Sequence, residues 1–232
     1  MTVDYPARAR HSMEKPGQPA SDQHDRGLFA LLSSARVYDW FQGLLGADRL
    51  QAEFVRSYVR PGSLPGGRIL DVGCGTASLR NHLPDCEYVG VDVSERYLEA
   101  ASTRHGHRRK ARFACVDVSD PAVLHSEGPF DLVIMSALLH HLDDVRAAAL
   151  LKAAARVLAA DGRLLALDAV LASESHPVGR MLVALDRGRH VRPAEEYRRL
   201  AEASFERIAV HVRHDLLRVP YSHVILECSK GR

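Results

Sequence analysis

The sequence predicts an α/β fold in which helices cover both faces of a doubly wound, mostly parallel sheet. Three observations point to this class. Strand-like and helix-like segments alternate regularly through the middle of the chain, which is typical of βαβ units. The strand-like runs are apolar on both faces, as expected for parallel strands covered by helices. The last two runs are joined by a connection with no room for a helix, so they must pair antiparallel.

The strands and helices can be placed along the chain from these runs. Parallel strands are expected at residues 68–73, 87–93, 111–118, 130–136 and 163–171, and the strands of a terminal hairpin at 207–213 and 221–228. Helices are expected from about Ala77, over 94–105, over 143–160 and over 192–205. The dipeptide Asp161-Gly162 predicts a turn into the fifth strand.

The N-terminal part of the chain differs from this alternating core. Residues 1–26 are polar, with Pro and Gly but little to bury, and predict a disordered tail. Residues 27–62 have helical apolar spacing and predict a helical cap. A segment of strong breakers, PGSLPGG, then leads into the main domain, which we place at 63–232.

Length and charge limit the function. The chain has 232 residues, enough for one full-sized domain, and a formal net charge of +2. With this small net charge, we expect no strong electrostatic attraction to nucleic acid or to anionic lipid. No apolar run reaches the roughly 18 residues of a membrane span, and the N-terminus has no apolar signal segment. We therefore expect a cytoplasmic protein with no nucleic-acid or membrane partner, and leave its oligomeric state open.

The four cysteines predict no metal site. Cys74, Cys86, Cys115 and Cys228 are dispersed and lack the CxxC spacing of a zinc site or a redox pair. Dispersed thiols in a chain of this size fit a reducing compartment. No acidic triad is evident either, so we expect no bound metal.

The stretch RILDVGCGTASL joins a strand end to an acid and two glycines. Gly73 and Gly75 let the backbone approach a ligand closely, where a Cβ would clash, and the helix start behind them offers free N–H groups. A dinucleotide fingerprint has a small residue at its sixth position, but here Ser78 stands there and Ala77 comes one place earlier. Asp71 inside the loop would repel a pyrophosphate and attract an ammonium group.

Two further acids end the next two strands. Asp92 comes about 20 residues after the glycines, where an acid accepts from ribose hydroxyls. Asp117 ends the third strand, where it can accept from an adenine amino group. The carboxyl ends of parallel strands meet at one ligand-binding edge. The ligand inferred is a nucleoside with a cationic, phosphate-free tail, and S-adenosylmethionine fits this description.

Five motifs in order carry a family resemblance. LDVGCGTA, VGVDVS, ACVDVSD, FDLVIMSALLHHLDD and LAADGRLLALDAVL resemble the successive motifs of the class I S-adenosylmethionine-dependent methyltransferases. The resemblance covers roughly residues 68 to 171, the terminal hairpin agrees with it, and Ala77 departs from it where many members have a third glycine. It implies a Rossmann-like sheet of seven strands in the order 3-2-1-4-5-7-6, with strand 7 antiparallel, and S-adenosyl-L-methionine as cofactor.

The resemblance also assigns cofactor-binding residues. It implies Asp71, Gly73, Cys74 and Gly75 for the methionine part, Asp92 with the following Val93 for the ribose, Asp117 with the Val118 amide for the adenine, and Ser136, through its backbone, by the methionine end.

ALLHHLDD places two histidines just beyond strand four, beside the expected sulfonium. Methyl transfer needs an aligned nucleophile, and a hydroxyl acceptor benefits from a base. We take His141 as the first candidate base and His140 as the second, and we expect one of them only to pack or to cap the helix at Asp143. Asp168, late in strand five, would orient a histidine ring. Some natural-product sugar O-methyltransferases of this class look similar at these positions.

Two basic segments leave alternatives open. DRGRHVR, at 186–192, gathers three arginines that would hold an acidic substrate or form a solvated loop. TRHGHRRKAR, at 103–112, would touch RNA or form a solvated loop far from the methyl site. The sequence favours O-methylation of a sugar or another secondary metabolite. The alternatives are an RNA or protein methyltransferase, an NAD-dependent oxidoreductase, and a non-catalytic partner that keeps the fold.

Overall fold

The computed structural model describes residues 46–64, 67–106, 110–117, 128–172, 177–185 and 189–231. The predicted tail, 1–26, and the first part of the predicted cap lie outside these residues. The rest of the cap forms α3 (Ala47–Phe54), the π-helical turn η1 (Val55–Val59) and the 3-10 turn η2 (Pro61–Ser63).

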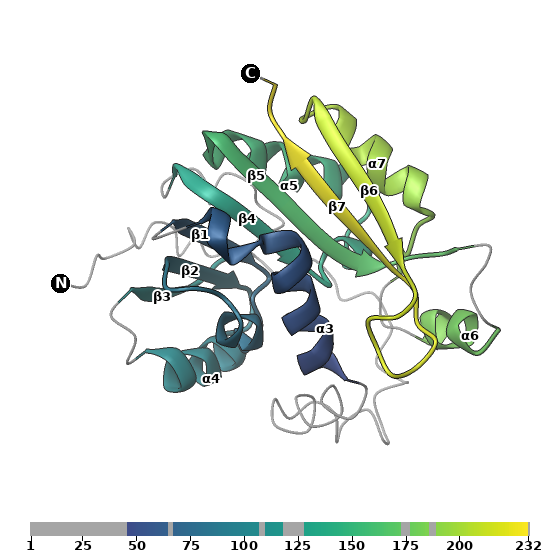
Figure 1. The fold of residues 1–232 in the computed structure, drawn as a ribbon, viewed down its shortest axis with the longest axis horizontal. Coiled ribbons are helices and arrows are strands. Elements are labelled where there is room, and N and C mark those ends of the chain that lie inside the picture. The colour runs from purple at the N-terminus through teal and green to yellow at the C-terminus, as the bar shows by residue number, and fades with distance from the viewer. Residues whose placement is uncertain are drawn as a thin grey trace, which may run out of the picture.

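One mixed sheet organises the described chain (Figure 1). Its strands are β1 (Arg68–Val72), β2 (Glu87–Asp92), β3 (Ala111–Cys115), β4 (Phe130–Ser136), β5 (Leu158–Ala169), β6 (Arg207–Arg213) and β7 (His223–Ser229). The order is β3-β2-β1-β4-β5-β7-β6. The first five strands pair in parallel, and β7 pairs antiparallel with both β5 and β6. This confirms the predicted strand order.

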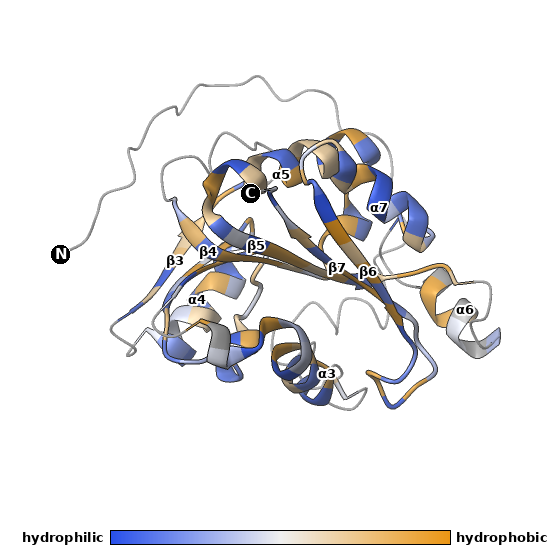
Figure 2. Ribbon diagram, turned by 45° about the horizontal axis from the view of Figure 1, so that its top comes forward, coloured by the Kyte–Doolittle hydropathy of each residue, from blue (hydrophilic) through white to orange (hydrophobic). Residues whose placement is uncertain are grey.

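Helices cover both faces of the sheet (Figure 2). The longer helices are α4 (Glu95–His105), α5 (Asp144–Val157), α6 (Pro177–Leu185) and α7 (Ala194–Glu202). In Figure 2, α5 and α7 lie above the sheet and α3 and α4 below it. No helix among the described residues is long and apolar enough to cross a membrane.

The two faces of the sheet form two separate apolar cores. Along β4, Val133 and Met135 belong to the core under α5 and α7, whereas Leu132 and Ile134 belong to the core that α3 shares. The division follows from the strand, because successive side chains point to opposite faces. Each such side chain contributes about 1.5–3 kcal/mol when fully buried. The cap is tied to this core, since Phe54 of α3 is fully buried within it.

The segment after β1 departs from the prediction. The helix expected from Ala77 is only the 3-10 turn η3 (Ser78–Asn81). Pro84 lies three residues beyond this turn, and a proline disfavours the helical conformation of the residue before it. The loop 73–75, here called the glycine loop, is therefore followed by one short turn rather than by a full helix.

Two strand boundaries also differ from the prediction. β3 ends at Cys115, opposite Asp92 at the end of β2, so the strand stops three residues early. α5 ends at Val157 and β5 begins at once at Leu158, which lengthens the strand at its start. The expected turn at Asp161-Gly162 lies inside β5, where the pairing with β4 shifts its register.

Candidate functional site

Asp71 lies near the carboxyl end of β1 and is almost completely buried, at 2 % exposure. Its Oδ2 accepts a hydrogen bond of 2.7 Å from the hydroxyl of Tyr88 on β2. Burial raises the pKa of Asp71 to about 7, the Tyr88 hydroxyl opposes the rise, and the charge of Asp92 adds to it. None of these influences is a cation, so the carboxylate suits a cationic ligand.

The backbone after Asp71 turns sharply through two glycines. Gly73 has a φ of 73° and Gly75 a φ of 54°, values that L side chains rarely adopt. The N–H groups of Gly73 and Cys74 both donate to the carbonyl of Val91, at 2.8 and 3.0 Å. A Cβ built on Gly75 would meet nothing within 4 Å. The open side of the loop at Gly75 therefore leaves space for a ligand.

Ala77 takes the conformation that a glycine would favour. Its φ is 53° and its side chain is fully buried. The left-handed conformation costs an alanine roughly 1–2 kcal/mol. His105, at the end of α4, contacts the Ala77 carbonyl through Nε2 at 3.0 Å. The loop is thus fixed from α4, by a buried residue that the sequence reasoning did not single out.

Asp92 ends β2 and binds the same loop. Its Oδ2 accepts from the Gly75 N–H and its Oδ1 from the Ser94 N–H, both at 2.8 Å. Each carboxylate oxygen has a second lone pair, so a ribose hydroxyl can still be accepted. Val93, the next residue, is 65 % exposed, as a residue that contacts a bound ligand would be in the free protein.

The other predicted cofactor residues follow the same edge. Asp117 lies just beyond β3 and is exposed, and Val118 lies outside the described residues. Ser136 ends β4, half-buried, opposite Leu167 of β5. The carboxyl ends of β1, β2, β3 and β4 therefore bring the predicted residues to one edge of the sheet.

Asp168 pairs with His140 rather than with His141. Its Oδ1 lies 2.5 Å from His140 Nδ1 and also accepts from the His140 N–H at 3.1 Å, while Oδ2 accepts from the Leu139 N–H at 3.2 Å. Both side chains of the pair are buried. His141 is exposed, and its ring centroid lies 4.1 Å from that of His140. The 3-10 turn η5 (Leu139–His141) presents both rings.

The two loops touch each other. A Cβ built on Gly73 would lie 3.1 Å from Cδ1 of Leu138, which precedes η5. Only glycine fits here without a steric clash. Gly73 therefore allows the close approach of the glycine loop to η5, which we call the histidine turn. The glycine loop and the turn that carries His140 therefore lie side by side.

Arg192 holds the histidine turn from the other side. It is buried, and its guanidinium donates to the carbonyls of Leu139 and Leu142 at 3.0 and 2.6 Å and to the Asp144 carboxylate at 2.8 Å. Of the three arginines of 186–192, Arg192 thus has a structural role, Arg189 is exposed, and residues 186–188 lie outside the described residues. No local signal in the sequence could have found this role, since its partners lie about 50 residues away.

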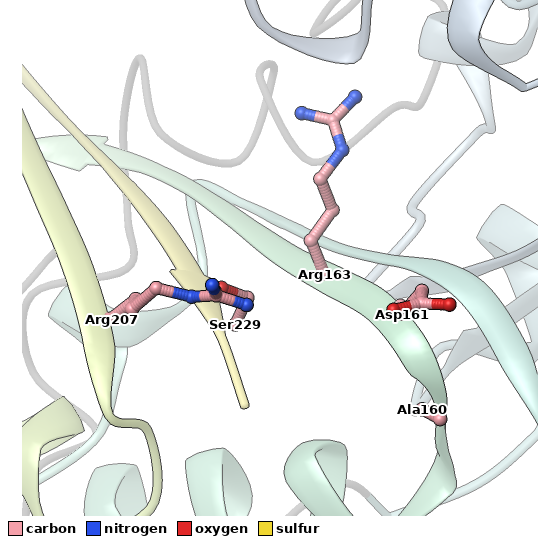
Figure 3. Close-up of a pocket in the computed structure, with 6 residues that line it drawn as sticks. Ala160, Asp161, Arg163, Arg207 and Ser229 are labelled. Atoms are coloured by element: carbon pink, nitrogen blue, oxygen red, sulfur yellow. The ribbon is translucent and has the colours of Figure 1, made fainter. Parts of the chain in front are cut away.

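A pocket at the opposite edge of the sheet has a different character. Its volume is about 350 Å³, and it is lined by Ala160, Asp161, Gly162, Arg163, Arg207 and Ser229. Figure 3 shows Arg207 reaching toward Ser229, while Arg163 points away from both. The pocket lies at the start of β5, and Asp168 lies at the end of that strand. It is therefore separate from the acids and histidines of the candidate site.

Metal binding has no support in the part of the chain that the structure describes. No group of three or more His, Cys, Asp or Glu side chains there could hold a metal ion. Burial, followed by the charges of Asp71 and Asp92, raises the pKa of the Cys74 thiol, which therefore stays neutral in the loop.

Comparison with known proteins finds methyltransferases. Residues 70–164 match the family described as "Methyltransferase domain". The ubiquinone biosynthesis O-methyltransferase of Bordetella avium is 32 % identical over 130 residues, which cover 53 % of this chain and 52 % of that protein. The chain spans about half or less of the length of the curated relatives it matches.

Solved structures share the fold at low sequence identity. Magnesium protoporphyrin IX methyltransferase from Synechocystis PCC 6803, solved with bound S-adenosylhomocysteine, has a TM-score of 0.64 at 20 % identity and covers 87 % of this chain and 97 % of its own. The pyocyanin biosynthetic protein PhzM has a TM-score of 0.65 at 16 % identity, covering 84 % and 58 %.

Proposed function

Because the chain carries a class I S-adenosylmethionine-dependent methyltransferase domain, we propose that it transfers the methyl group of this cofactor to an oxygen of a small molecule, with a histidine as general base. The proposed acceptor is a sugar or another secondary metabolite. The observation that carries the proposal is the contact of the glycine loop with the histidine turn at Gly73 and Leu138.

The residues present fit the cofactor. Asp71 offers a buried carboxylate whose protein partner is a neutral hydroxyl, so an ammonium group would satisfy its charge. The open side of Gly75 and the remaining lone pairs of Asp92 suit a ligand lying along the loop. The sheet order, with its antiparallel β7, also differs from the 3-2-1-4-5-6 order of dinucleotide-binding dehydrogenases.

The base is proposed from the pair at the carboxyl ends of β4 and β5. When bound, the cofactor supplies an activated methyl carbon for in-line displacement. Asp168 accepts three hydrogen bonds, so it holds the hydrogen on His140 Nδ1 and leaves Nε2 as the basic nitrogen. This geometry makes His140 the first candidate. His141, which the sequence placed first, becomes the second, because Asp168 pairs with the ring of His140 and the exposed His141 ring lies beside it.

An RNA substrate gains no support from the described part of the basic run 103–112, of which residues 107–109 lie outside the described residues. Lys110 forms an ion pair with Asp85 at 3.2 Å, and Arg112 forms one with Glu87 at 3.1 Å. These partners offset the positive charge that a phosphate backbone would need. A small-molecule acceptor is therefore the proposal that the charges favour.

Binding tests the cofactor before any acceptor is known. The full chain is titrated with S-adenosylhomocysteine and, separately, with NADH in a calorimeter. We expect heat only with S-adenosylhomocysteine, and a clean titration with NADH alone would overturn the proposal.

Turnover then tests the base. Production of S-adenosylhomocysteine is followed with a panel of phenols, sugars and carboxylic acids. With an accepted substrate, His140→Ala should lower the rate by about 10²–10⁴-fold, as for loss of a general base, and His141→Ala by less than about tenfold. Both variants should bind S-adenosylhomocysteine like the wild type. The reverse ranking would give the role to His141, and equal rates for all three proteins would remove both histidines from the mechanism.

A further inference from the structure

Tyr88 lies at a position where a buried strand would normally carry an apolar side chain. It is fully buried within β2, and its ring packs edge-on against Phe113 with centroids 5.9 Å apart. A buried tyrosine hydroxyl needs a hydrogen-bond partner, and this one donates to Asp71 at 2.7 Å. The buried hydroxyl of Tyr88 therefore binds the same acid that the cofactor is proposed to contact.

The surroundings make room for this hydroxyl. A Cβ on Gly90 would lie 3.0 Å from Tyr88 Cε1 and 2.9 Å from Cys74 Sγ. Gly90 is the β2 residue paired with Asp71, so its missing side chain opens the space in which ring, thiol and carboxylate meet. The contact between Tyr88 and Asp71 thus depends on Asp71 of β1 and on Tyr88 and Gly90 of β2.

The charged and titratable groups around the pair are few among the described residues. Asp92 raises the pKa of Asp71, whereas the Tyr88 hydroxyl lowers it. Arg80 lies 5.6 Å from the centroid of the Tyr88 ring, and its guanidinium donates to the carbonyls of Leu83 and Pro84. Burial raises the pKa of Tyr88 well above its ordinary value, so the hydroxyl stays a donor at physiological pH.

We infer that Tyr88 is a positioning residue of the cofactor site: its hydroxyl fixes the orientation of Asp71 and keeps this carboxylate ionised for the ammonium group of the ligand. The identity of the ligand rests on the proposed function. The hydroxyl of Tyr88 reaches Asp71 from the neighbouring strand β2. Its hydrogen bond stabilises the charged form of Asp71, and because the hydroxyl is neutral it does not compete with a cationic ligand.

The first test needs no ligand. The titration of the Asp71 carboxyl is followed by carbon NMR in the free wild type and in Tyr88→Phe. We expect a midpoint near pH 7 in the wild type and a midpoint about one unit higher in the variant, because a hydrogen bond to an ionised group is lost. Equal midpoints in the two proteins would overturn the inference.

The second test uses S-adenosylhomocysteine at several pH values. Tyr88→Phe should bind it about fivefold more weakly at pH 7, where midpoints near 7 and 8 leave about half and about a tenth of Asp71 ionised, and nearly as well as the wild type at pH 8.5, where Asp71 is mostly ionised in both. A structural role alone would weaken binding equally at every pH. That uniform loss, or no loss, would contradict a role in ionisation.

Tyr197→Phe is the matched control. Tyr197 is also fully buried, but its hydroxyl donates to the carbonyl of Ala169 at 2.9 Å. This variant loses a buried hydroxyl of the same kind without touching Asp71, so it should leave the titration of Asp71 and the pH dependence of binding unchanged. A similar shift in Tyr197→Phe would assign the effect to general loosening of the fold and overturn the inference.

One outcome separates this inference from the proposed function. If the wild type binds no S-adenosylhomocysteine, the proposed function fails, while the NMR titration still decides the role of Tyr88.

If Tyr88→Phe does not fold, Gly90→Ala replaces it, because its added Cβ would push against the Tyr88 ring. The same upward shift of the Asp71 midpoint is then expected, and an unchanged midpoint in a folded Gly90→Ala would contradict the inference.

Discussion

Asp71 and Asp168 are equally buried carboxylates on the same edge of one sheet, yet their surroundings differ. Each is 2 % exposed. Asp168 accepts hydrogen bonds from two backbone N–H groups and from the ring of His140. The hydrogen bond found at Asp71 comes from the hydroxyl of Tyr88. The comparison teaches that the hydrogen bonds of the β5 acid hold the protein's own turn, whereas the β1 acid, with a hydroxyl partner and a raised pKa, is suited to a cationic ligand.

Asp168→Asn is the strongest way to break this comparison. Whichever way the new amide turns, its NH₂ group faces a donor that the carboxylate accepted, so a buried donor loses its partner. We expect turnover to fall about 10²–10⁴-fold, the free energy of unfolding to fall by about 1–3 kcal/mol, and affinity for S-adenosylhomocysteine to stay within about threefold.

Asp161→Asn is its control, since Asp161 lies on the same strand but is exposed. It should leave turnover and stability unchanged. Turnover close to the wild-type rate in Asp168→Asn would show that the acid does not act through His140.

Asp71→Asn sharpens the other side of the comparison. The change removes a buried charge but keeps an acceptor for the Tyr88 hydroxyl. We expect affinity for S-adenosylhomocysteine to fall about 10- to 100-fold at pH 8. Isothermal titration at that pH measures the loss, and unchanged affinity would remove Asp71 from the ligand contact.

The same variant should be more stable than the wild type without ligand. The folded-state pKa of Asp71 is raised from 3.8 to about 7, so the native state holds its proton more tightly than the unfolded chain. Its ionisation therefore costs the wild type stability progressively as pH rises from about 4 to about 7. The difference in Tm between Asp71→Asn and wild type should be near zero at pH 4 and largest above pH 7. A constant difference would contradict this assignment.

Ala77→Gly should have the smallest effect. Glycine relieves the left-handed conformation, worth roughly 1–2 kcal/mol, but gives up a buried methyl and adds freedom to the unfolded chain, each worth about 0.5–1 kcal/mol. The free energy of unfolding should change by less than about 1 kcal/mol. Urea unfolding measures it, and a loss above about 2 kcal/mol would show that the Ala77 methyl is essential to packing.

The sequence was most informative where local pattern decides structure. The acids Asp71 and Asp92 follow apolar runs, and parallel strands bring their carboxyl ends to one edge, so both could be placed without coordinates. The helix expected after Ala77 was wrong, because a short connection containing Pro84 leaves room for one turn only. In β5, the signal of Asp161-Gly162 coincides with an irregularity inside the strand, where the register with β4 shifts between Leu158 and Arg163.

Contacts between distant segments could not be predicted in this way. Whether Asp168 meets His140 or His141 depends on the rotation of a 3-10 turn, and both histidines fit the sequence pattern equally well. Arg192 reaches across about 50 residues to its carbonyls. Tyr88 did leave a signal, since a hydroxyl inside the apolar run EYVGVD must find a polar partner.

The place of β7 in the sheet has a consequence for synthesis. β7 lies between β5 and β6, although it follows both along the chain. While the ribosome is still making residues 223–229, β5 is an edge strand with unpaired N–H and C=O groups, and Asp168 is carried on that edge. The strand that carries Asp168 therefore gains its second neighbour only when β7 arrives, whereas β1, β2 and β3 can already have assembled the glycine loop.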